Sequence, residues 1–381
     1  MNLKTILLAC GVFCASVSAG EIAVVLDAAS PRGKLLAEAG FVLKPYDDVL
    51  PVLAADACPL AVVDATPANL NALAGASDKL KVFTDKGGWV VLWGVTPEGL
   101  ADFNKIVGVD HILRPFVAEG VLMPSTPDPL LRGLDPDNLY ITTDKPVTGF
   151  SGQIPTLIHA DDAWSYVLDT DDIAPFSSFP SANYWRPDDK GAVIGTDRYP
   201  PNMVNGLCED WQLGFTIPTD KPEFVKWTFT FPRPETVTAF SIIPDTGYRK
   251  IAQLRLSFVG SDAKPVELAV KPEMTRQEFP ILPTHATGLT LEILKTTEHK
   301  VAATGIRNLW IKVQRSDAFR QKVKPLLNIG VLIKYPMGTG GIIVSQLRIQ
   351  DRELIKDARE KKKAILCTLL KNLGTGLGTA Q

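Results

Sequence analysis

The sequence predicts an α/β domain built on a parallel sheet, with an all-β domain of the sandwich or jelly-roll type inserted into it. Over residues 21–165, short apolar runs alternate with helical stretches, which is typical of a parallel sheet covered on both faces. From about residue 176, proline and aromatic residues become dense and short strand patterns follow one another, which indicates a β-sandwich. After residue 315 the α/β pattern returns.

The first α/β segment contains three predicted strands and three predicted helices. Continuous apolar runs predict strands at 22–26, 60–64 and 89–93. Helical periodicity passes through Leu35, Leu36 and Ala39, then covers 68–85, and finally 97–106. Gly87 and Gly88 follow the second of these stretches, where a helix commonly ends.

The all-β segment begins with a clean alternation of apolar and polar residues. Over 224–231, Val225, Trp227, Phe229 and Phe231 alternate with polar residues, which predicts a half-buried strand. We expect a turn at 232–235 and further strands near 236–243, 251–259, 265–270, 288–295 and 306–314. Tryptophans on or beside these strands are expected in the core: Trp211, Trp227 and Trp310.

The last segment predicts two strands and one helix. Residues 329–335 and 341–349 are apolar runs around a glycine-rich turn at 336–340, and 357–373 carries an apolar helical stripe with Gly374 behind it. A hairpin and a lone helix need a partner, so we assign them to the first α/β segment. The predicted parts are therefore 20–165 and 317–381 for a discontinuous α/β domain, and 166–316 for the inserted β-sandwich with its entry linker.

The first nineteen residues predict a cleavable secretory signal. Lys4 precedes a short apolar run, and Val17, Ser18 and Ala19 supply the small residues that a signal peptidase recognises. Cys10 stands in a lipobox-like sequence, so lipidation is the alternative that we weigh less. No later run is long enough to span a bilayer. We expect a secreted or periplasmic protein without a transmembrane segment.

Charge and cysteine content exclude two classes of function. The formal net charge is −2, whereas nucleic-acid binding favours a basic face, so no nucleic-acid partner is expected. Beyond residue 19 the cysteines are Cys58, Cys208 and Cys367, far apart in sequence. This spacing indicates neither a zinc site nor a disulfide framework, and each thiol is expected to be a small buried residue. No cofactor is predicted.

Parts of the chain resemble known families. The 87–94 strand and turn, the 128–134 segment and the 335–341 hairpin make the α/β part similar to the flavodoxin-like fold of class I glutamine amidotransferases, and closer still to their ThuA-like relatives. Residues 200–314 resemble a discoidin (coagulation-factor C-type) domain, a galactose-binding-like jelly roll, through 204–211, 227–231 and 306–313. The combination resembles the non-catalytic region of bacterial secreted β-galactosidase-like proteins.

The resemblance implies a nucleophile elbow of the type Gly-x-Cys-x-Gly, and this chain departs from it. The matching run starts at Gly94 and has Thr96 where the cysteine would be, followed by Pro97. A proline has no N–H to serve as an oxyanion donor. The same residues fit a helix start, with Thr96 as N-cap, Pro97 at the first position and Glu98 near the positive helix end. We interpret the elbow as structural.

No other catalytic set emerges from the sequence. The four histidines, His111, His159, His285 and His299, do not share metal-ligand spacing, and each is expected to be a surface or capped residue. The acid pairs 161–162, 171–172 and 188–189 raise the possibility of glycoside hydrolysis. Adjacent acids usually point in different directions, so we interpret these pairs as solvated loop residues. The glycines at 338–341 lack the ending of a phosphate loop and indicate a hairpin turn.

Aromatic residues beside guanidinium groups are the candidate ligand-binding residues, because sugars pack on aromatic rings and bind planar polar groups. Tyr248 and Arg249 lie in a loop between two predicted strands. Trp185, Arg198 and Tyr199 are alternatives ahead of the first strand. Related modules often hold a structural calcium in the region that corresponds to Asn205 and Asp210, although asparagine replaces the usual first ligand, so calcium is only a possible cofactor.

We therefore expect an exported, non-catalytic carbohydrate-binding or accessory protein, in which the β-sandwich loops hold a poly- or oligosaccharide and the α/β domain is a scaffold. Two alternatives stay open. One is a glycan-active hydrolase of the β-galactosidase-like kind, with its site at the strand C-termini of the parallel sheet. The other is a protein-interaction module of the cell envelope, for which a protein partner is required.

Overall fold

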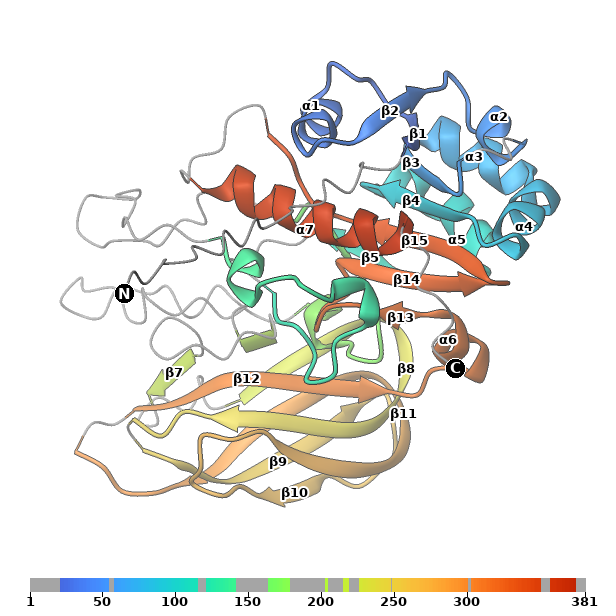
Figure 1. Ribbon diagram of the computed structural model, residues 1–381. Coiled ribbons are helices and arrows are strands. Elements are labelled where there is room, and N and C mark those ends of the chain that lie inside the picture. Colours follow the sequence, from blue (N-terminus) through green and yellow to red (C-terminus); the bar gives the residue numbers. More distant parts are fainter. Residues whose placement is uncertain are drawn as a thin grey trace, which may run out of the picture.

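A computed structural model of the chain contains an α/β part and a β-rich part (Figure 1). The helix α6 (Asp317–Lys322) lies where the two parts meet (Figure 1). The structure describes the following residues: 21–54, 58–115, 121–141, 164–178, 203–204, 215–218, 226–247, 249–300, 303–350 and 357–374.

The α/β part is built on a seven-stranded mixed sheet. Its strands follow the order β13 (Lys324–Pro325), β14 (Leu332–Met337), β15 (Gly340–Ser345), β4 (Trp89–Trp93), β3 (Leu60–Asp64), β1 (Glu21–Val25) and β2 (Val42–Pro45). The five strands from β15 to β2 are mutually parallel, and β14 and β13 are antiparallel additions at one edge. Strands from both ends of the sequence thus form one sheet, and the predicted parallel arrangement is confirmed.

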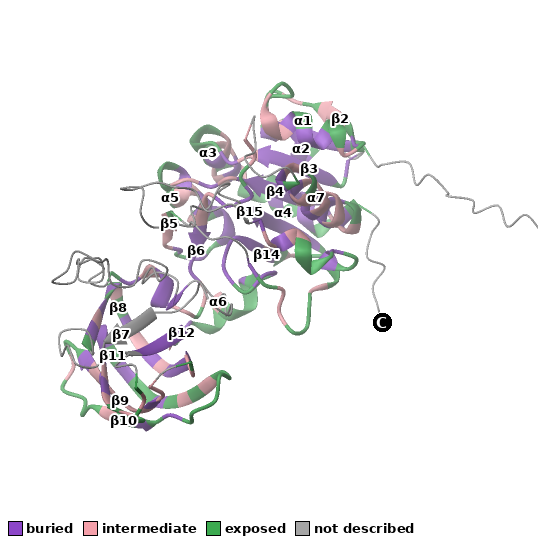
Figure 2. Cartoon of the chain, turned by 90° about the vertical axis from the view of Figure 1, so that its left-hand side faces the viewer, coloured by how far each residue is buried: buried purple, intermediate pink, exposed green. Residues whose placement is uncertain are grey.

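Helices cover both faces of this sheet. Alternate residues of β3 point to opposite faces, with Val62 in one core cluster and Val63 in the other. One face packs against α1 (Pro31–Glu38), α7 (Ala358–Gly374) and the 3-10 turns η2 (Pro129–Leu131) and η3 (Pro136–Leu139). The other face packs against α2 (Val49–Ala54), α3 (Pro67–Gly75), α4 (Ser77–Asp85) and α5 (Leu100–Val107). Buried residues line the strands between these layers (Figure 2).

Local sequence signals explain where these helices start and stop. Ser30 and Thr66 cap α1 and α3 by accepting backbone hydrogen bonds, and a proline follows each. The single helix predicted over 68–85 is wrong, because the chain breaks at Ala76 between α3 and α4. Gly75 ends α3, in keeping with the low helix propensity of glycine. The elements β2, α2, α6 and β13 are not predicted by the sequence patterns.

A two-stranded antiparallel sheet connects the first α/β segment to the β-rich part. It pairs β5 (Leu113–Pro115) with β6 (Tyr166–Leu168), and Leu113 lies opposite Leu168. The N–H of Leu168 donates to the carbonyl of Gly330 at 2.9 Å. A Cβ atom on Gly330 would come within 1.9 Å of the Leu168 carbonyl oxygen, so this close approach requires glycine.

The β-rich part is one antiparallel six-stranded sheet that bends over its own core. The order is β10 (Val266–Ala269), β9 (Ile251–Val259), β11 (Gln277–Thr296), β8 (Lys226–Pro244), β12 (Ala303–Val313) and β7 (Phe215–Pro218). The first half of β8 pairs with the second half of β11, which also pairs with β9. The second half of β8 pairs with β12. The two long strands therefore contribute to both layers, as strands do when they turn a sheet corner.

Two register shifts between β8 and β11 produce this bend. Glu235 lies opposite Ala286 but Thr230 lies opposite Gly288, so four residues of β8 face a single residue of β11. The predicted turn at 232–235 is thus wrong: the chain continues in one strand, and the two prolines occupy the unpaired corner where no ladder hydrogen bond is lost. The second shift sets three residues of β11 (281–283) against Thr238 alone.

The core of the β-rich part is a single cluster between the two layers, with Phe229, Phe240 and Leu289 fully buried in it. The segment 171–178 closes one side, because Asp172 bridges to Lys312 of β12 and Ser178 to Thr230 of β8. Trp227 is in the core as expected, at 1% exposure. Trp310 is not in the core. Its neighbours Leu309 and Ile311 point inward, and Trp310 points to the opposite face of the sheet. Trp211 lies outside the described residues.

Candidate functional site

The turn after β4 does not have the geometry of an active nucleophile elbow. Gly94 has φ +80°, and Thr96 is extended at φ −113° and ψ 167°. Thr96 and Pro97 occupy the positions expected for a helix start, but the helix begins as a 3-10 turn (η1, Pro97–Gly99) and the Thr96 side chain makes no capping hydrogen bond. Instead, a hydrogen bond with Thr96 lowers the pKa of Glu98. The expected N-cap interaction of Thr96 is therefore wrong.

An arginine–aspartate pair occupies the edge of the parallel sheet where this turn lies. Arg32 follows β1 and donates from Nη1 to Asp64 at the end of β3 (2.5 Å) and to the Trp93 carbonyl at the end of β4 (3.2 Å). A Cβ atom on Gly94 would lie 2.4 Å from Arg32 Nη2. Open α/β sheets bind ligands at this edge. Here Arg32 lies beside Gly94, and the hydroxyl of Thr96 interacts with Glu98, a carboxylate whose lowered pKa makes it a weak base.

A second polar site lies at the junction of the two parts, around His111 and Asp169. His111 precedes β5 and Asp169 follows β6, so the antiparallel pairing of these strands brings the two residues together. The Asp169 Oδ1 atom lies 2.8 Å from His111 Nδ1 and accepts the N–H of Ile112 at 3.0 Å. The side chains of both residues have no exposed surface. The expectation that every histidine is a surface or capped residue is wrong for His111.

Tyr335 of β14 completes a chain of three polar groups. Its hydroxyl lies 2.9 Å from His111 Nε2. An ionised Asp169 can only accept hydrogen bonds, so in the neutral imidazole Nδ1 carries the proton and Nε2 accepts from the tyrosine. The order carboxylate, imidazole, hydroxyl is that of a hydrolase triad. Burial, and then the charge of Asp169, raise the pKa of Tyr335 well above its usual value. Tyr335 is 1% exposed, so this hydroxyl is enclosed by protein and does not open onto the surface.

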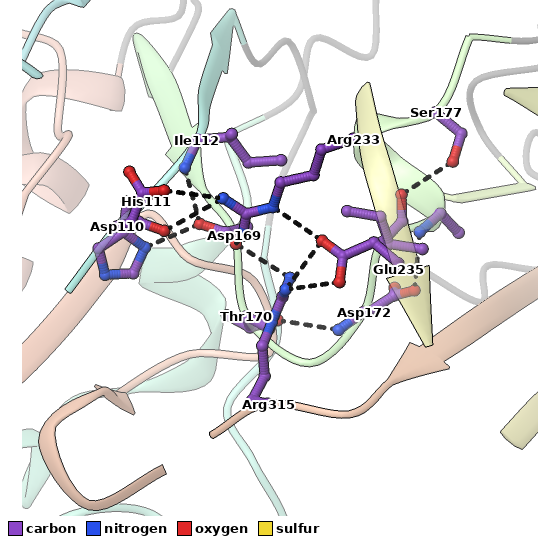
Figure 3. A network of polar contacts seen from close by, with 12 residues as sticks. Asp110, His111, Ile112, Asp169, Thr170, Asp172, Ser177, Arg233, Glu235 and Arg315 are labelled. Carbon is purple, nitrogen blue, oxygen red and sulfur yellow. Dashed lines mark hydrogen bonds and ion pairs between the residues drawn. The ribbon is translucent and has the colours of Figure 1, made fainter. Parts of the chain in front are cut away.

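Two arginines and a glutamate extend the site into the β-rich part (Figure 3). Arg315, just after β12, forms an ion pair with Asp169 Oδ2 at 2.9 Å and donates to both carboxylate oxygens of Glu235 at 3.0 and 3.1 Å. Arg233 reaches Asp169 Oδ2 at 3.2 Å and Glu235 Oε1 at 2.9 Å. We call Asp169, Arg233, Glu235 and Arg315, with His111 and Tyr335, the junction network.

The junction network connects three segments and is balanced in charge. His111 and Tyr335 come from the α/β part, Asp169 from the linker, and the other three residues from the corner of β8 and the end of β12. Two carboxylates face two guanidinium groups. Buried charges are tolerated only when they are paired in this way. The sequence analysis missed this site, because residues that are 58 and 224 positions apart carry no common signal in one sequence.

Beside the junction network lies an open groove of about 400 Å³. Its walls are the end of β12 (Lys312, Val313, Gln314 and Arg315), Thr238 of β8, Pro283 in the β11 bulge, Asp171 of the linker and Arg320 of α6. Pro283, one of the three unpaired β11 residues opposite Thr238, forms one of these walls. Bulges of this kind are frequent beside binding sites.

Charged groups of both signs line the groove. The Lys312 Nζ atom lies 4.0 Å from Asp171 and 3.6 Å from Glu278, and Arg320 pairs with Asp317. The adjacent Asp172 is half-buried by area, but protein atoms surround its carboxyl group. Burial raises its pKa to about 7, although it accepts hydrogen bonds from the N–H groups of Ile311 (2.9 Å) and Ala174 (3.0 Å). Asp171 is a solvated acid as expected; Asp172 is not.

Most of the predicted ligand-binding residues lie outside the described residues: Tyr248, Trp185, Arg198, Tyr199, Asn205 and Asp210. The same holds for residues 1–19 with Cys10, for Cys208, and for the acid pairs 161–162 and 188–189. Arg249 is described and half-buried. In the same loop Asp245 accepts the N–H of Gly247 at 2.8 Å and lies 4.0 Å from Arg307 of β12. The structure therefore brings two arginines and an aspartate to this end of the sheet.

Metal-ligand clusters and membrane-spanning helices were sought in the described part of the chain. Within it, no cluster of three or more His, Cys, Asp or Glu side chains has the arrangement of a metal site, and no helix has the length and apolar character that crossing a bilayer requires. Cys58 is buried as expected and Cys367 is half-buried; burial raises the pKa of both thiols. The glycine-rich residues at 338–341 form the predicted hairpin turn between β14 and β15.

The chain matches no protein-family model and no curated protein. Among solved structures it is similar to carbohydrate-binding modules. The family 32 module of Clostridium perfringens NanJ in complex with galactose is 11% identical, with a TM-score of 0.20 over 23% of this chain and 64% of that module, less than two thirds. The family 32 module of Streptococcus pneumoniae EndoD is 12% identical (TM-score 0.25; 30% and 84% covered). The GH31 CBM32-2 module bound to GalNAc is 10% identical (TM-score 0.25; 37% and 97%).

Proposed function

We propose that this chain is an exported, non-catalytic carbohydrate-binding protein, and that the groove of the β-rich part holds the glycan. The observation that carries the proposal is the chemistry of the groove lining. Six of the eight side chains named above are polar or charged, and only Val313 and Pro283 are apolar. These six residues offer hydrogen-bond donors and acceptors to a ligand with several hydroxyl groups, and the apolar atoms of the lining offer surface to its C–H groups.

The rigidity of the groove supports the same proposal. Arg315 is fixed by Glu235 and Asp169, and its Nε donates to the Thr170 carbonyl at 2.7 Å. The N–H of Val313 donates to the Asp171 carbonyl at 2.8 Å, and that of Gln314 to the Thr236 carbonyl at 2.8 Å. Polar side chains on a fixed backbone bind a ligand with a small loss of conformational entropy. The junction network is, in this proposal, the support of the groove.

The test is a glycan array on the full exported chain, followed by calorimetry with the glycans that bind. We expect Gln314→Ala and Lys312→Ala each to weaken binding by about tenfold. The matched controls are Gln253→Ala on β9 and Lys295→Ala on β11, which lie in the same sheet but do not line the groove; they should bind like the native chain. Absence of binding to every glycan, or equal losses in both pairs, would overturn the proposal.

Several finer assignments belong to this proposal. The α/β part, made of residues 20–165 and 317–381, is a degenerate scaffold of the flavodoxin-like, ThuA-like kind, and residues 166–316 are a discoidin-like insertion. The order β2-β1-β3-β4-β15 of the parallel strands supports the first assignment, because flavodoxin-like sheets are wound in this order. Arg249 with Tyr248, Trp185, Arg198 and Tyr199 is a second candidate surface, and Asn205 with Asp210 a candidate calcium site. Mass spectrometry of the exported protein tests signal cleavage before Gly20.

One observation favours a hydrolase as the second candidate. Asp171 lines the groove and is 60% exposed, while the pKa of the neighbouring Asp172 is raised to about 7. Glycosidases use one protonated and one ionised carboxyl group. Release of reducing sugar by the native chain, abolished in Asp171→Asn, would favour this function over the non-catalytic one.

A further inference from the structure

We propose that the face of the β-rich sheet beside the groove, at Trp310 and Arg276, is a second sugar subsite, so that the ligand is an oligosaccharide with at least two residues. This inference rests on the proposed function and adds the length of the ligand to it. It follows from the position of Trp310, its contact with Arg276, and the continuity of this face with the groove.

Trp310 belongs to a row of side chains that runs across three strands on the outer face of the sheet. Ser241 of β8 pairs with Glu278 of β11 on one side and with Trp310 of β12 on the other. The inward-pointing neighbours Phe240 and Ile311 are fully buried in the core. Since side chains alternate along a strand, the row lies on the face away from the core. Trp310 is half-buried there beside the fully buried Ser241, and it does not contribute to the core.

Arg276 lies over the ring of Trp310. Its guanidinium carbon is 4.2 Å from the centre of the ring. The other contacts of Arg276 are long: 3.4 Å to the hydroxyl of Ser241 and 3.6 Å to the carboxylate of Glu278. The Arg276 side chain is 41% exposed. Exposed ion pairs of this length contribute little, so displacing Arg276 costs mainly its stacking on Trp310. A sugar that takes its place on the ring can accept hydrogen bonds from the displaced guanidinium group.

Lys312 connects this row to the groove. It stands two residues after Trp310 on β12, pairs with Ala239 of β8 and lines the groove. Positions i and i+2 of a strand share a face and are ~6.6 Å apart. A ligand seated against Lys312 and Gln314 therefore reaches Trp310 by extension along β12, without crossing to another surface. Glu278 lies in the row of Trp310 and 3.6 Å from Lys312, so it borders both the proposed subsite and the groove.

The experiment is calorimetry on the full chain with gluco-, galacto-, manno- and xylo-oligosaccharides, each series running from the monosaccharide to the tetrasaccharide. For the series that binds, we expect the affinity of the native chain to rise at least about tenfold with length. Trp310→Ala should abolish this gain and leave monosaccharide affinity within about twofold; Trp310→Phe should restore part of it. The control is Arg255→Ala on β9, outside the row and the groove, which should behave as native.

The outcomes separate the two proposals. Native length dependence in Trp310→Ala, with intact binding of the native chain, would overturn the second subsite and leave the groove as the glycan site. An affinity of the native chain that does not change with saccharide length would also overturn the second subsite and leave the groove as the glycan site. If the native chain binds no saccharide of any length, the proposed function and this inference both fall. Native far-UV circular dichroism and an unchanged melting transition for Trp310→Phe guard against a loss due to misfolding.

Discussion

His111 and Asp169 are 58 residues apart in the chain, yet Nδ1 of the imidazole and Oδ1 of the carboxylate lie 2.8 Å from each other at the junction of the α/β and β-rich parts. The remaining oxygen of the same carboxylate faces Arg233 and Arg315. One buried aspartate thus contacts an imidazole ring from one part and two guanidinium groups from the other. Its removal would leave both kinds of partner without their acceptor.

The first prediction concerns this carboxylate. Asp169→Asn keeps the shape of the side chain but leaves the buried guanidinium group of Arg315 with Glu235 as its acidic partner, and the half-buried one of Arg233 with Glu235 and the exposed Asp110. Breaking a buried ion pair from one side costs ~3 kcal/mol, because an uncompensated charge remains. We expect a loss of about that size in the free energy of unfolding, measured by urea denaturation.

A matched surface substitution provides the control for Asp169. Asp85→Asn removes the partner of Lys81, in an i,i+4 pair whose side chains are 68% and 44% exposed. Exposed pairs of this kind contribute below ~1 kcal/mol. Equal losses for Asp169→Asn and Asp85→Asn would contradict the role assigned to the junction network. Hydrogen exchange should report the difference locally, with faster exchange of the N–H groups of Ile112 and of position 169, which bond to each other's residue at the junction.

The second prediction concerns the tyrosine at the other end of the imidazole. Tyr335→Phe keeps the edge-on packing of the ring against Phe103 but leaves His111 Nε2 buried without its donor. A buried acceptor that loses its partner costs ~1–3 kcal/mol. We expect that loss in thermal or urea unfolding. Tyr166→Phe on β6, at a half-buried position, is the control and should change stability by less than ~0.5 kcal/mol.

The sequence predicted those elements whose signal is local. The strands 60–64, 89–93 and 251–259 are observed at their predicted bounds, because each is a continuous or alternating apolar run between clear breaks. The corner at 232–235 was mistaken for a turn for the same reason: two prolines in four residues are a strong local signal. Only the pairing with β11 distinguishes a bend within a strand from a chain reversal.

The site was less accessible to prediction than the fold. The residues next to His111, Asp110 and Ile112, do not mark it as buried, and its partners Asp169 and Tyr335 reach it through the β5–β6 pairing and the position of β14. Trp310 lies in an apolar strand, which predicts a place in the core. Which face of the sheet its side chain occupies depends on the register of β12 with β8. Arg249 alone of the predicted ligand residues lies in the described part.

The third prediction concerns the turn after β4. Gly94 has φ +80°, and an added Cβ would lie 2.4 Å from Arg32 Nη2. Gly94→Ala should therefore cost ~2 kcal/mol, from the left-handed backbone and from displacement of Arg32 away from Asp64. Gly75→Ala is the matched control, because it ends α3 with open space around its Cβ position; it should be neutral or slightly stabilising. Chemical denaturation of the two variants in parallel distinguishes a strained turn from a tolerant one.

The fourth prediction concerns pH and follows from Asp172. Its pKa is raised from 3.8 to about 7 in the folded chain, so between these values the folded state binds more protons at this site than the unfolded state. Stability from this group is therefore greatest below pH ~4 and is lost as the pH rises through about 7. Asp172→Asn cannot ionise and still accepts the N–H groups of Ile311 and Ala174.

The quantity to measure is the difference in stability between the native chain and Asp172→Asn as a function of pH. The free energy of unfolding of the native chain minus that of Asp172→Asn should become more negative by ~1–3 kcal/mol between pH 4 and pH 8, since ionisation in the native chain places an uncompensated charge beside the groove wall. Asp171→Asn, at a 60% exposed position, should show no such trend. A native-minus-Asn difference that is constant across this range, in urea titrations at closely spaced pH values, would show that Asp172 is already ionised throughout and that its surroundings do not disfavour the charge.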